Sequence, residues 1–235
     1  MDKEFSFRTA MIANADGADV SLQNTDYSRR GVADTEVLFR NLTEKLIEQI
    51  NAADAVFGCV AWLTSVPVLS ALATKKAVGI VVQKEDFLRP DSGDWRQKRQ
   101  REAYAKLPGF IRYSLGQTGH YDYASTPESD AVRCVGAHNS TKSAAFPRMH
   151  NKFLVFCRGA VVDDGSTYET YKPYAVWTGS FNLTYNASNS LENAILIRDL
   201  KISTAFLDEF GLIFGLSERL DWSQSWSAPE YRIGS

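Results

Sequence analysis

The sequence has few of the residues that build metal centres and disulfide frameworks. Its 235 residues include three cysteines and three histidines. The cysteines at 59, 134 and 157 stand far apart, are odd in number and form no CxxC pair, which excludes a disulfide framework and favours a reducing compartment. There is also no HxxxH, HxH or mixed Cys/His cluster. We therefore expect neither a metal nor another cofactor.

Long apolar runs and an excess of positive charge are missing as well. No stretch approaches the ~18 apolar residues of a membrane span, and the N-terminal segment lacks the apolar centre of a signal peptide. We therefore expect a cytoplasmic protein without a membrane partner. The formal net charge is -2, so any contact with a polyanion would depend on a local basic patch.

The apolar residues that are present suffice for a core, at 44% of the chain against 23% charged. Leucine or isoleucine recurs at every fourth position from 38 to 50. This spacing predicts an amphipathic helix that follows a cap at Asp34 or Thr35. The helix would present one face to the core.

Two almost uniformly apolar runs, at 55–63 and 77–83, predict strands that are covered on both faces. A short helix from Pro67 to Leu72 would lie between them. Alternating helices and strands with short connections predict an α/β fold with a mixed central sheet flanked by helices.

Residues 84–147 interrupt this pattern and predict a long irregular insertion, in which His120 and His138 would be surface groups. The insertion begins with a helix at about 93–107. Between positions 89 and 112, seven lysines or arginines face three acidic residues. This helix is either a solvated surface or a phosphate-tracking patch, with Trp95 and Tyr104 available for stacking. In the second case Arg96, Arg99 and Arg101 would contact substrate.

The last third of the chain predicts three strands and a closing helix. Apolar runs at 152–157 and 174–179 bracket an elongated connection, and a further strand is expected at 193–199. Residues 201–217 form an aromatic-rich helical pattern. The tail that follows, with Trp222 and Trp226, is expected to pack on the body.

Three polar groups come next to these apolar runs: His150 with Lys152, then Gly179-Ser180-x-Asn182, then Glu192. Polar side chains at the ends of neighbouring strands converge on one site. An imidazole and an ammonium side by side suggest that an anion belongs between them.

That anion could be a phosphodiester. Lys152 would supply a positive charge, and Ser180 and Asn182 would supply hydroxyl and amide donors as charge shifts in the transition state. A neutral His150 could attack phosphorus. Glu192 could hold the other imidazole nitrogen and stabilise the cation that forms. Asn189, in the loop after GSFN, is a further candidate for substrate contact.

The order HxK, GSxN and a carboxylate resembles the phospholipase D superfamily, clearly over residues 148–198 and more loosely over 34–83. GSFN followed by SLENA is most similar to the bacterial endonuclease branch with a single motif. The resemblance implies one phospholipase D-like domain over 1–235. Its parts would be a helix–strand half at 34–83, the insertion at 84–147 and a catalytic half at 148–220.

Two features depart from the family pattern. Cys157 stands five residues after Lys152, where the family has an aspartate. The resemblance therefore implies a working but altered site, in which Asp163 or Asp164 could take the place of the aspartate. Gly179 also follows His150 by 29 residues, which is more than in the simple family pattern. The extra residues fall in the connection between two predicted strands.

The family chemistry uses two motifs, because one histidine attacks and the other protonates the leaving oxygen. This chain has one motif, so the resemblance implies a homodimer that combines His150 and Lys152 from both subunits in one composite site.

The sequence favours a metal-independent phosphodiesterase acting on nucleic acid, DNA rather than RNA, through a phosphohistidine. Two alternatives stay open. One is a phospholipid phosphodiesterase or phosphatidyl transferase. The other is a non-catalytic subunit that binds phosphate or DNA, suggested by Cys157. A larger assembly that contains an ATPase is left open as well.

Overall fold

The computed structural model describes residues 11–13, 18–21, 34–85, 88, 95–111, 128–139, 143, 146, 148–163 and 167–225. The strands of its main sheet are β3 (Asp34–Leu38), β4 (Ala55–Val60), β5 (Ala77–Gln83), β8 (Val132–Val135), β9 (Lys152–Asp163), β10 (Thr167–Gly179) and β11 (Ala194–Arg198). The helices are α1 (Leu42–Ala52), α2 (Val66–Leu72), α3 (Trp95–Tyr104), α4 (Tyr185–Ser188) and α5 (Leu200–Gly215). Two small sheets pair β1 (Met11–Ala13) with β2 (Asp19–Ser21) and β6 (Phe110–Ile111) with β7 (Glu128–Ser129).

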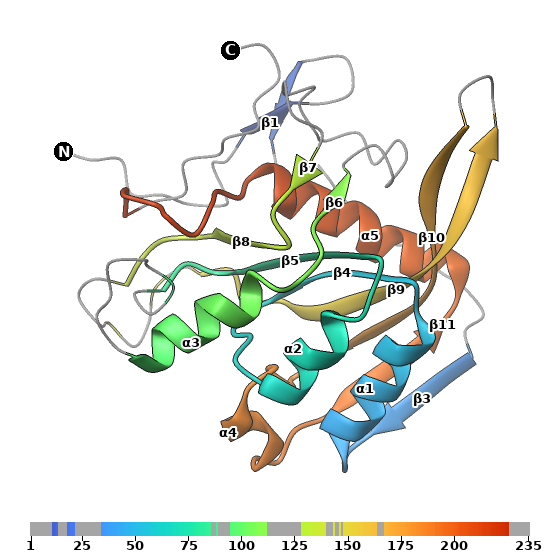
Figure 1. Cartoon of the computed structure of the whole chain (residues 1–235), viewed down its shortest axis with the longest axis horizontal. Helices are drawn as coiled ribbons and strands as arrows, with labels where there is room; N and C mark the ends of the chain where they lie inside the picture. The colour runs from blue at the N-terminus through green and yellow to red at the C-terminus, as the bar shows by residue number, and fades with distance from the viewer. Residues whose placement is uncertain are drawn as a thin grey trace.

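The main sheet has seven strands in the order β3-β11-β10-β9-β4-β5-β8. The β4–β5 and β5–β8 pairs are parallel and the other pairs are antiparallel. Helix α5 lies on one side of the sheet, and α1 and α2 lie on the other (Figure 1). The expected α/β fold with a mixed central sheet flanked by helices is confirmed.

Successive residues of β9 enter two different cores. Leu154 and Phe156 belong to the core that contains α1 and α2. Phe153, Val155 and Cys157 belong to the core beneath α5. All five side chains are buried, and each large apolar one stabilises the fold by about 1.5–3 kcal/mol. The alternation follows from the two-residue period of a strand, and it places Lys152 on the side of α1 and α2.

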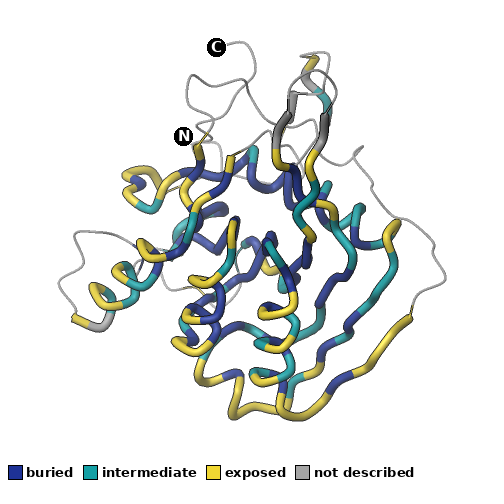
Figure 2. Tube along the Cα trace, turned by 45° about the vertical axis from the view of Figure 1, so that its right-hand side comes forward, coloured by how far each residue is buried: buried dark blue, intermediate teal, exposed yellow. Residues whose placement is uncertain are grey.

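The expected strands and helices are largely present, with one correction near the N-terminal end. Residues 34–38 form β3 rather than the start of a helix, and α1 begins at Leu42. The reason is tertiary: β3 pairs with β11, and Arg198 forms ion pairs with Asp34 (3.5 Å) and Glu36 (2.5 Å). Figure 2 shows this edge strand as mostly exposed.

A second correction concerns the insertion. Its helix is confirmed as α3, but residues 114–147 are not irregular throughout, because Val132–Val135 join the main sheet as β8. All four residues of β8 are buried, and β8 pairs in parallel with β5. Burial on both faces explains why a strand of only four residues is stable at this edge.

The elongated connection at 158–173 continues both flanking strands. β4 pairs with β9 only as far as Cys157, and β11 pairs with β10 only from Val176 onward. Beyond these points β9 and β10 pair only with each other, so they project from the body as a two-stranded ribbon (Figures 1 and 2).

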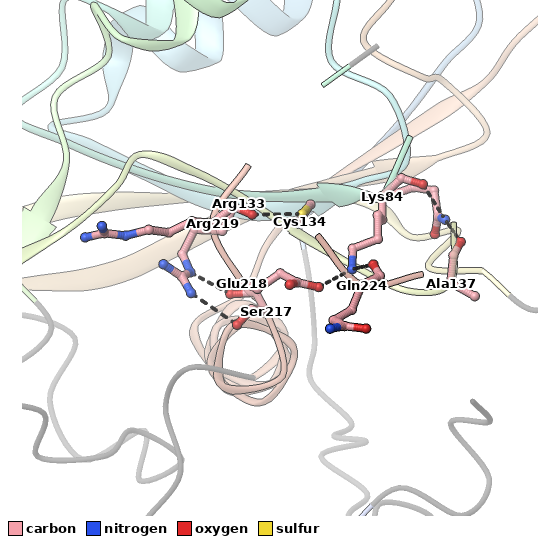
Figure 3. Close-up of polar contacts among 9 residues, drawn as sticks. Lys84, Arg133, Cys134, Ala137, Ser217, Glu218, Arg219 and Gln224 are labelled. Carbon is pink, nitrogen blue, oxygen red and sulfur yellow. Dashed lines mark hydrogen bonds and ion pairs between the residues drawn. The ribbon is translucent and has the colours of Figure 1, made fainter. Parts of the chain in front are cut away.

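The segment after α5 is fixed to the ends of β5 and β8. Lys84 is fully buried, forms an ion pair with Glu218 and donates to the carbonyl of Gln224 at 2.8 Å (Figure 3). Its ammonium lies 4.6 Å from the ring centre of Trp222. The expected packing of Trp222 on the body is confirmed, whereas Trp226 lies outside the described residues.

Candidate functional site

The predicted site residues gather where four strands begin or end. β9 begins at Lys152 and β10 ends at Gly179, and their antiparallel register sets these two residues opposite each other, one step beyond the pair Phe153–Thr178. β11 begins at Ala194, paired with Gly179. β4 ends beside Lys152, which pairs with Val60. Main-chain pairing alone therefore brings the HxK segment, the GSFN segment and the Glu192 segment to one end of the sheet.

Gly179 allows two of these segments to approach closely. Its φ is +156°, and a Cβ built there would lie 2.3 Å from the carbonyl oxygen of Asn193. Only glycine fits such an approach without displacing the backbone. The next residue, Ser180, donates its N–H to that same carbonyl at 3.1 Å.

The side chain of Ser180 lies at the centre of a small network. Its hydroxyl donates to the carboxylate of Glu192 and accepts from the backbone N–H of Asn193 at 3.1 Å and from the Asn193 amide at 3.3 Å. Among the described residues, Glu192 is therefore bonded to Ser180 rather than to His150, for which it was expected. This pairing keeps the carboxylate beside the β10–β11 junction.

His150 is exposed, and its ring lies edge-on to that of Trp62, with 5.9 Å between the centroids. Burial by its neighbours lowers the pKa of His150, and the charges of Lys152 and Arg148 lower it further. This lowered pKa favours the neutral imidazole at pH 7, the form that a nitrogen nucleophile requires.

Lys152 is half-buried and donates to the carbonyl of His150 at 3.0 Å. Burial lowers the pKa of Lys152, Glu192 opposes that effect, and Arg148 adds to it. The site thus holds more positive charge than the carboxylate of Glu192 offsets. An anion placed there would relieve this repulsion.

Sequence reasoning missed Gln83, which fixes the backbone beside His150. Its amide is fully buried; the oxygen accepts the N–H of Met149 at 2.8 Å, and the nitrogen donates to the carbonyls of Ala137 (2.8 Å) and Lys84 (3.1 Å). Gly136, with φ +100°, makes room, since a Cβ there would lie 2.5 Å from the Gln83 oxygen. The sequence did offer one signal for this role, since Gln83 is a polar residue at the end of the apolar run 77–83.

Arg148 was also missed, although its position in the sequence could have indicated it. It stands two residues before His150, as Lys152 stands two after. The charge of Arg148 lowers the pKa of both His150 and Lys152, so its guanidinium lies close to both groups. Arg148 therefore adds a second cation beside Lys152.

The GSFN loop is fixed to the end of β4. Leu183 donates its N–H to the carbonyl of Trp62 at 3.1 Å, and its own carbonyl accepts from the N–H groups of Thr64 and Ser65 at 2.8 and 2.9 Å. Beside it, the side-chain oxygen of Asn182 is buried and has no hydrogen-bond partner among the described residues. An amide oxygen only accepts, so it cannot bond an unprotonated phosphate oxygen, whereas the amide nitrogen of Asn182 can donate to one.

The other predicted contact residues lie on α3 and at the end of α4. Asn189 is exposed and donates to the carbonyl of Tyr185 at 2.9 Å, which closes the turn of α4. Arg99 and Arg101 lie on α3, where Arg101 lines a separate hollow of about 440 Å³ with Asp130 and Arg219. The side chain of Arg96 lies outside the described residues.

Helix α3 is nonetheless attached next to the site. The hydroxyl of Tyr104 and the amide of Gln100 both donate to the carbonyl of Leu63, the amide at 3.1 Å. Tyr104 is buried, which raises its pKa, so the expectation that it stacks on a base is wrong. Trp95 is 66% exposed and remains able to stack.

Cys157 lies away from the candidate site. It is fully buried in the core beneath α5, on the face of β9 opposite to Lys152, and burial raises the pKa of its thiol. Asp163 cannot replace an aspartate beside Lys152, because it ends β9 at the far end of the strand. Asp164 lies outside the described residues.

His138 is half-buried rather than a surface group, with its ring 5.0 Å from that of Trp222, and His120 lies outside the described residues. Within the part of the chain that the structure describes, no three His, Cys, Asp or Glu side chains converge as ligands for a metal. No helix in that part is long and apolar enough to cross a membrane.

This chain is similar in sequence to a viral protein. No family model matches the chain. An uncharacterized protein of Acanthamoeba polyphaga mimivirus is 32% identical over 201 residues, which are 78% of this chain and 66% of the viral protein. This chain thus spans slightly less than two thirds of that relative.

Two solved structures are similar in fold at low sequence identity. Nuc from Salmonella typhimurium, a phospholipase D family member, is 16% identical with a TM-score of 0.48 and covers 80% of this chain and 97% of its own. NucT from Helicobacter pylori is 14% identical with a TM-score of 0.47 and covers 76% of this chain and 94% of its own. The chain is thus structurally similar, over most of its length, to Nuc, a phospholipase D family member, and to NucT.

Proposed function

We propose that this protein is a metal-independent phosphodiesterase that cleaves nucleic acid through a phosphohistidine at His150. The observation that carries the proposal is the meeting of His150, Lys152, Ser180 and Glu192 at one end of the sheet. A neutral imidazole beside the ammonium of Lys152 and a set of hydrogen-bond donors suits attack on a phosphodiester.

In the proposed reaction a nitrogen of His150 attacks phosphorus, and the bond to the leaving oxygen breaks. Lys152 and the donors of Ser180 and Asn182 stabilise the charge on the remaining phosphate oxygens. A general acid protonates the leaving oxygen, and water then hydrolyses the phosphohistidine, which returns His150 to its starting state.

His150 cannot serve as nucleophile and general acid in the same step. We therefore propose a homodimer in which the second subunit supplies the general acid, with its own His150 near the first. The exposure of His150 is compatible with such an approach. A solution mass at twice that of the chain supports the composite site, and a strict monomer contradicts it.

The nucleic-acid substrate is supported by α3. Lys98 and Arg99 are exposed on it, Trp95 is 66% exposed, and the helix is fixed to Leu63 beside the site. A basic face with an exposed aromatic ring suits a polynucleotide strand. We propose DNA as the substrate, with RNA as the alternative.

The test is cleavage of plasmid, single-stranded DNA and RNA in excess EDTA. The wild-type protein is expected to cleave at least one of them, with DNA preferred, and His150→Ala is expected to be inactive. His138→Gln is the matched control, since it replaces a histidine outside the site and should keep activity. Cleavage that survives His150→Ala contradicts the proposal, and so does turnover of phospholipid vesicles alone.

A further inference from the structure

The segment that leads into β9 carries a feature that the catalytic proposal does not use. Arg148 lies two residues before His150, half-buried, with its guanidinium 4.2 Å from the ring centre of Phe146. Contact with an aromatic face helps to fix the plane of a guanidinium. Its backbone is fixed as well, because the next residue, Met149, is buried and bonded to Gln83.

The spacing along this segment is informative. Two residues of backbone span at most about 7 Å. This is comparable with the length of one nucleotide in an extended strand. A phosphate at His150 and Lys152 would therefore have its neighbour along the strand close to Arg148. A guanidinium suits that position, since its fork of donors matches two phosphate oxygens.

We infer that Arg148 binds the phosphate next to the one that is cleaved, so that the site takes a polynucleotide strand rather than an isolated phosphodiester. The inference rests on the proposed function for the identity of the scissile phosphate. It assigns Arg148 to substrate binding and selection, while His150 and Lys152 act at the reacting phosphorus.

The test compares a substrate that has a neighbouring phosphate with one that lacks it. Binding of a fluorescent single-stranded DNA oligonucleotide is measured by anisotropy over a salt series, in the His150→Ala background so that nothing is cleaved. Turnover of bis(p-nitrophenyl) phosphate, which has a single phosphate, is measured with His150 intact. Arg158→Gln is the matched control, since it removes an equal charge from β9 about 20 Å beyond Lys152.

Arg148→Gln is expected to weaken oligonucleotide binding about tenfold and to reduce the slope of log K against log salt by about 0.7. Turnover of the small diester should change less than about twofold, and Arg158→Gln should change neither quantity. Unchanged binding and slope overturn the inference, as does an equal loss with both substrates or failure of the His150→Ala protein to bind the oligonucleotide. If the wild-type protein hydrolyses neither substrate, the proposed function is wrong. The binding measurement still tests the role of Arg148, because it does not depend on hydrolysis.

Discussion

The hydroxyl of Ser180 donates to the carboxylate of Glu192, which joins the end of β10 to the loop that begins β11. The same oxygen accepts two hydrogen bonds from Asn193. Ser180 is therefore the link that sets the position of Glu192, and because a hydroxyl has one proton it can donate to phosphate only by turning away from that carboxylate. This linking role could not be assigned from the GSxN pattern alone.

Replacing Ser180 with alanine should reduce activity about 100-fold, because a donor to the phosphate is lost and the half-buried Glu192 loses its partner. Stability should fall by only about 1–2 kcal/mol. The measurements are kcat/KM and urea unfolding. Ser190→Ala is the control, since Ser190 is an exposed serine of the same loop that donates to Asn186 at 2.9 Å. Equal losses in both variants would contradict the assigned role.

The titration of His150 should respond to its cationic neighbour. Lys152 is one of the charges that lower the pKa of His150, so Lys152→Gln should raise that pKa towards the ordinary histidine value. Because one His150 attacks as the neutral imidazole while its counterpart must carry a proton to act as general acid, the wild-type rate should fall on both sides of a maximum, with the acid side below the ordinary histidine range. An NMR pH titration, assigned with His150→Ala, measures the pKa directly. A pKa that stays the same or falls in Lys152→Gln would show that the two groups do not interact.

The amide of Gln83 should control the position of His150 through Met149. Gln83→Met keeps the volume but removes the hydrogen bond to the Met149 N–H, so that amide should exchange faster with solvent. In Gln83→Met we expect kcat to fall by a larger factor than KM rises, because the change displaces the attacking group His150. Gln100→Met is the control, because it removes a similar amide from α3. Unchanged exchange at Met149 in Gln83→Met would rule out this role.

The buried pair of Lys84 and Glu218 should be sensitive to loss of one partner. Lys84→Met leaves Glu218 buried without its cation and should destabilise the protein by about 3–5 kcal/mol, whereas adding Glu218→Leu should recover most of that loss. Urea unfolding measures both variants. The exposed pair of Lys76 and Glu169, at 3.2 Å, should contribute less than about 1 kcal/mol. Equal effects at the two pairs would contradict this assignment.

Restoring the aspartate of the family pattern should not improve the proposed activity. Cys157→Asp would place a carboxylate in the core beneath α5, away from Lys152, and should destabilise the fold by about 3 kcal/mol or more. Cys157→Ser should cost less and leave kcat unchanged. A stable and more active Cys157→Asp would mean that this position does serve the site.

The sequence predicted the elements whose pattern is local. β4, β5, α2 and α5 lie close to where apolar periodicity placed them. The HxK and GSxN segments meet because one begins β9, the other ends β10, and these two strands are antiparallel neighbours. β3 was mistaken for part of a helix, because Leu38 continues the four-residue spacing of α1 while pairing with β11 decides its conformation. β8 was missed because its four residues are stabilised by β5 rather than by their own pattern.

Contacts of individual side chains were less predictable. Gln83 reaches Met149 across 66 positions of sequence, and the partner of Glu192 is decided by the close approach at Gly179. The spacing of residues along the sequence does not predict which side chains meet across such long separations. Arg148 is the exception, since its place two residues before His150 could have been read from the sequence.

The central claim is that His150 forms a covalent bond to phosphorus. The most direct measurement is to mix the protein with an oligonucleotide, quench without acid and examine the His150 peptide by mass spectrometry. We predict a phospho-adduct on His150 that is absent from His150→Ala. Cleavage of the oligonucleotide with no adduct, or with an adduct on another residue, would contradict the mechanism.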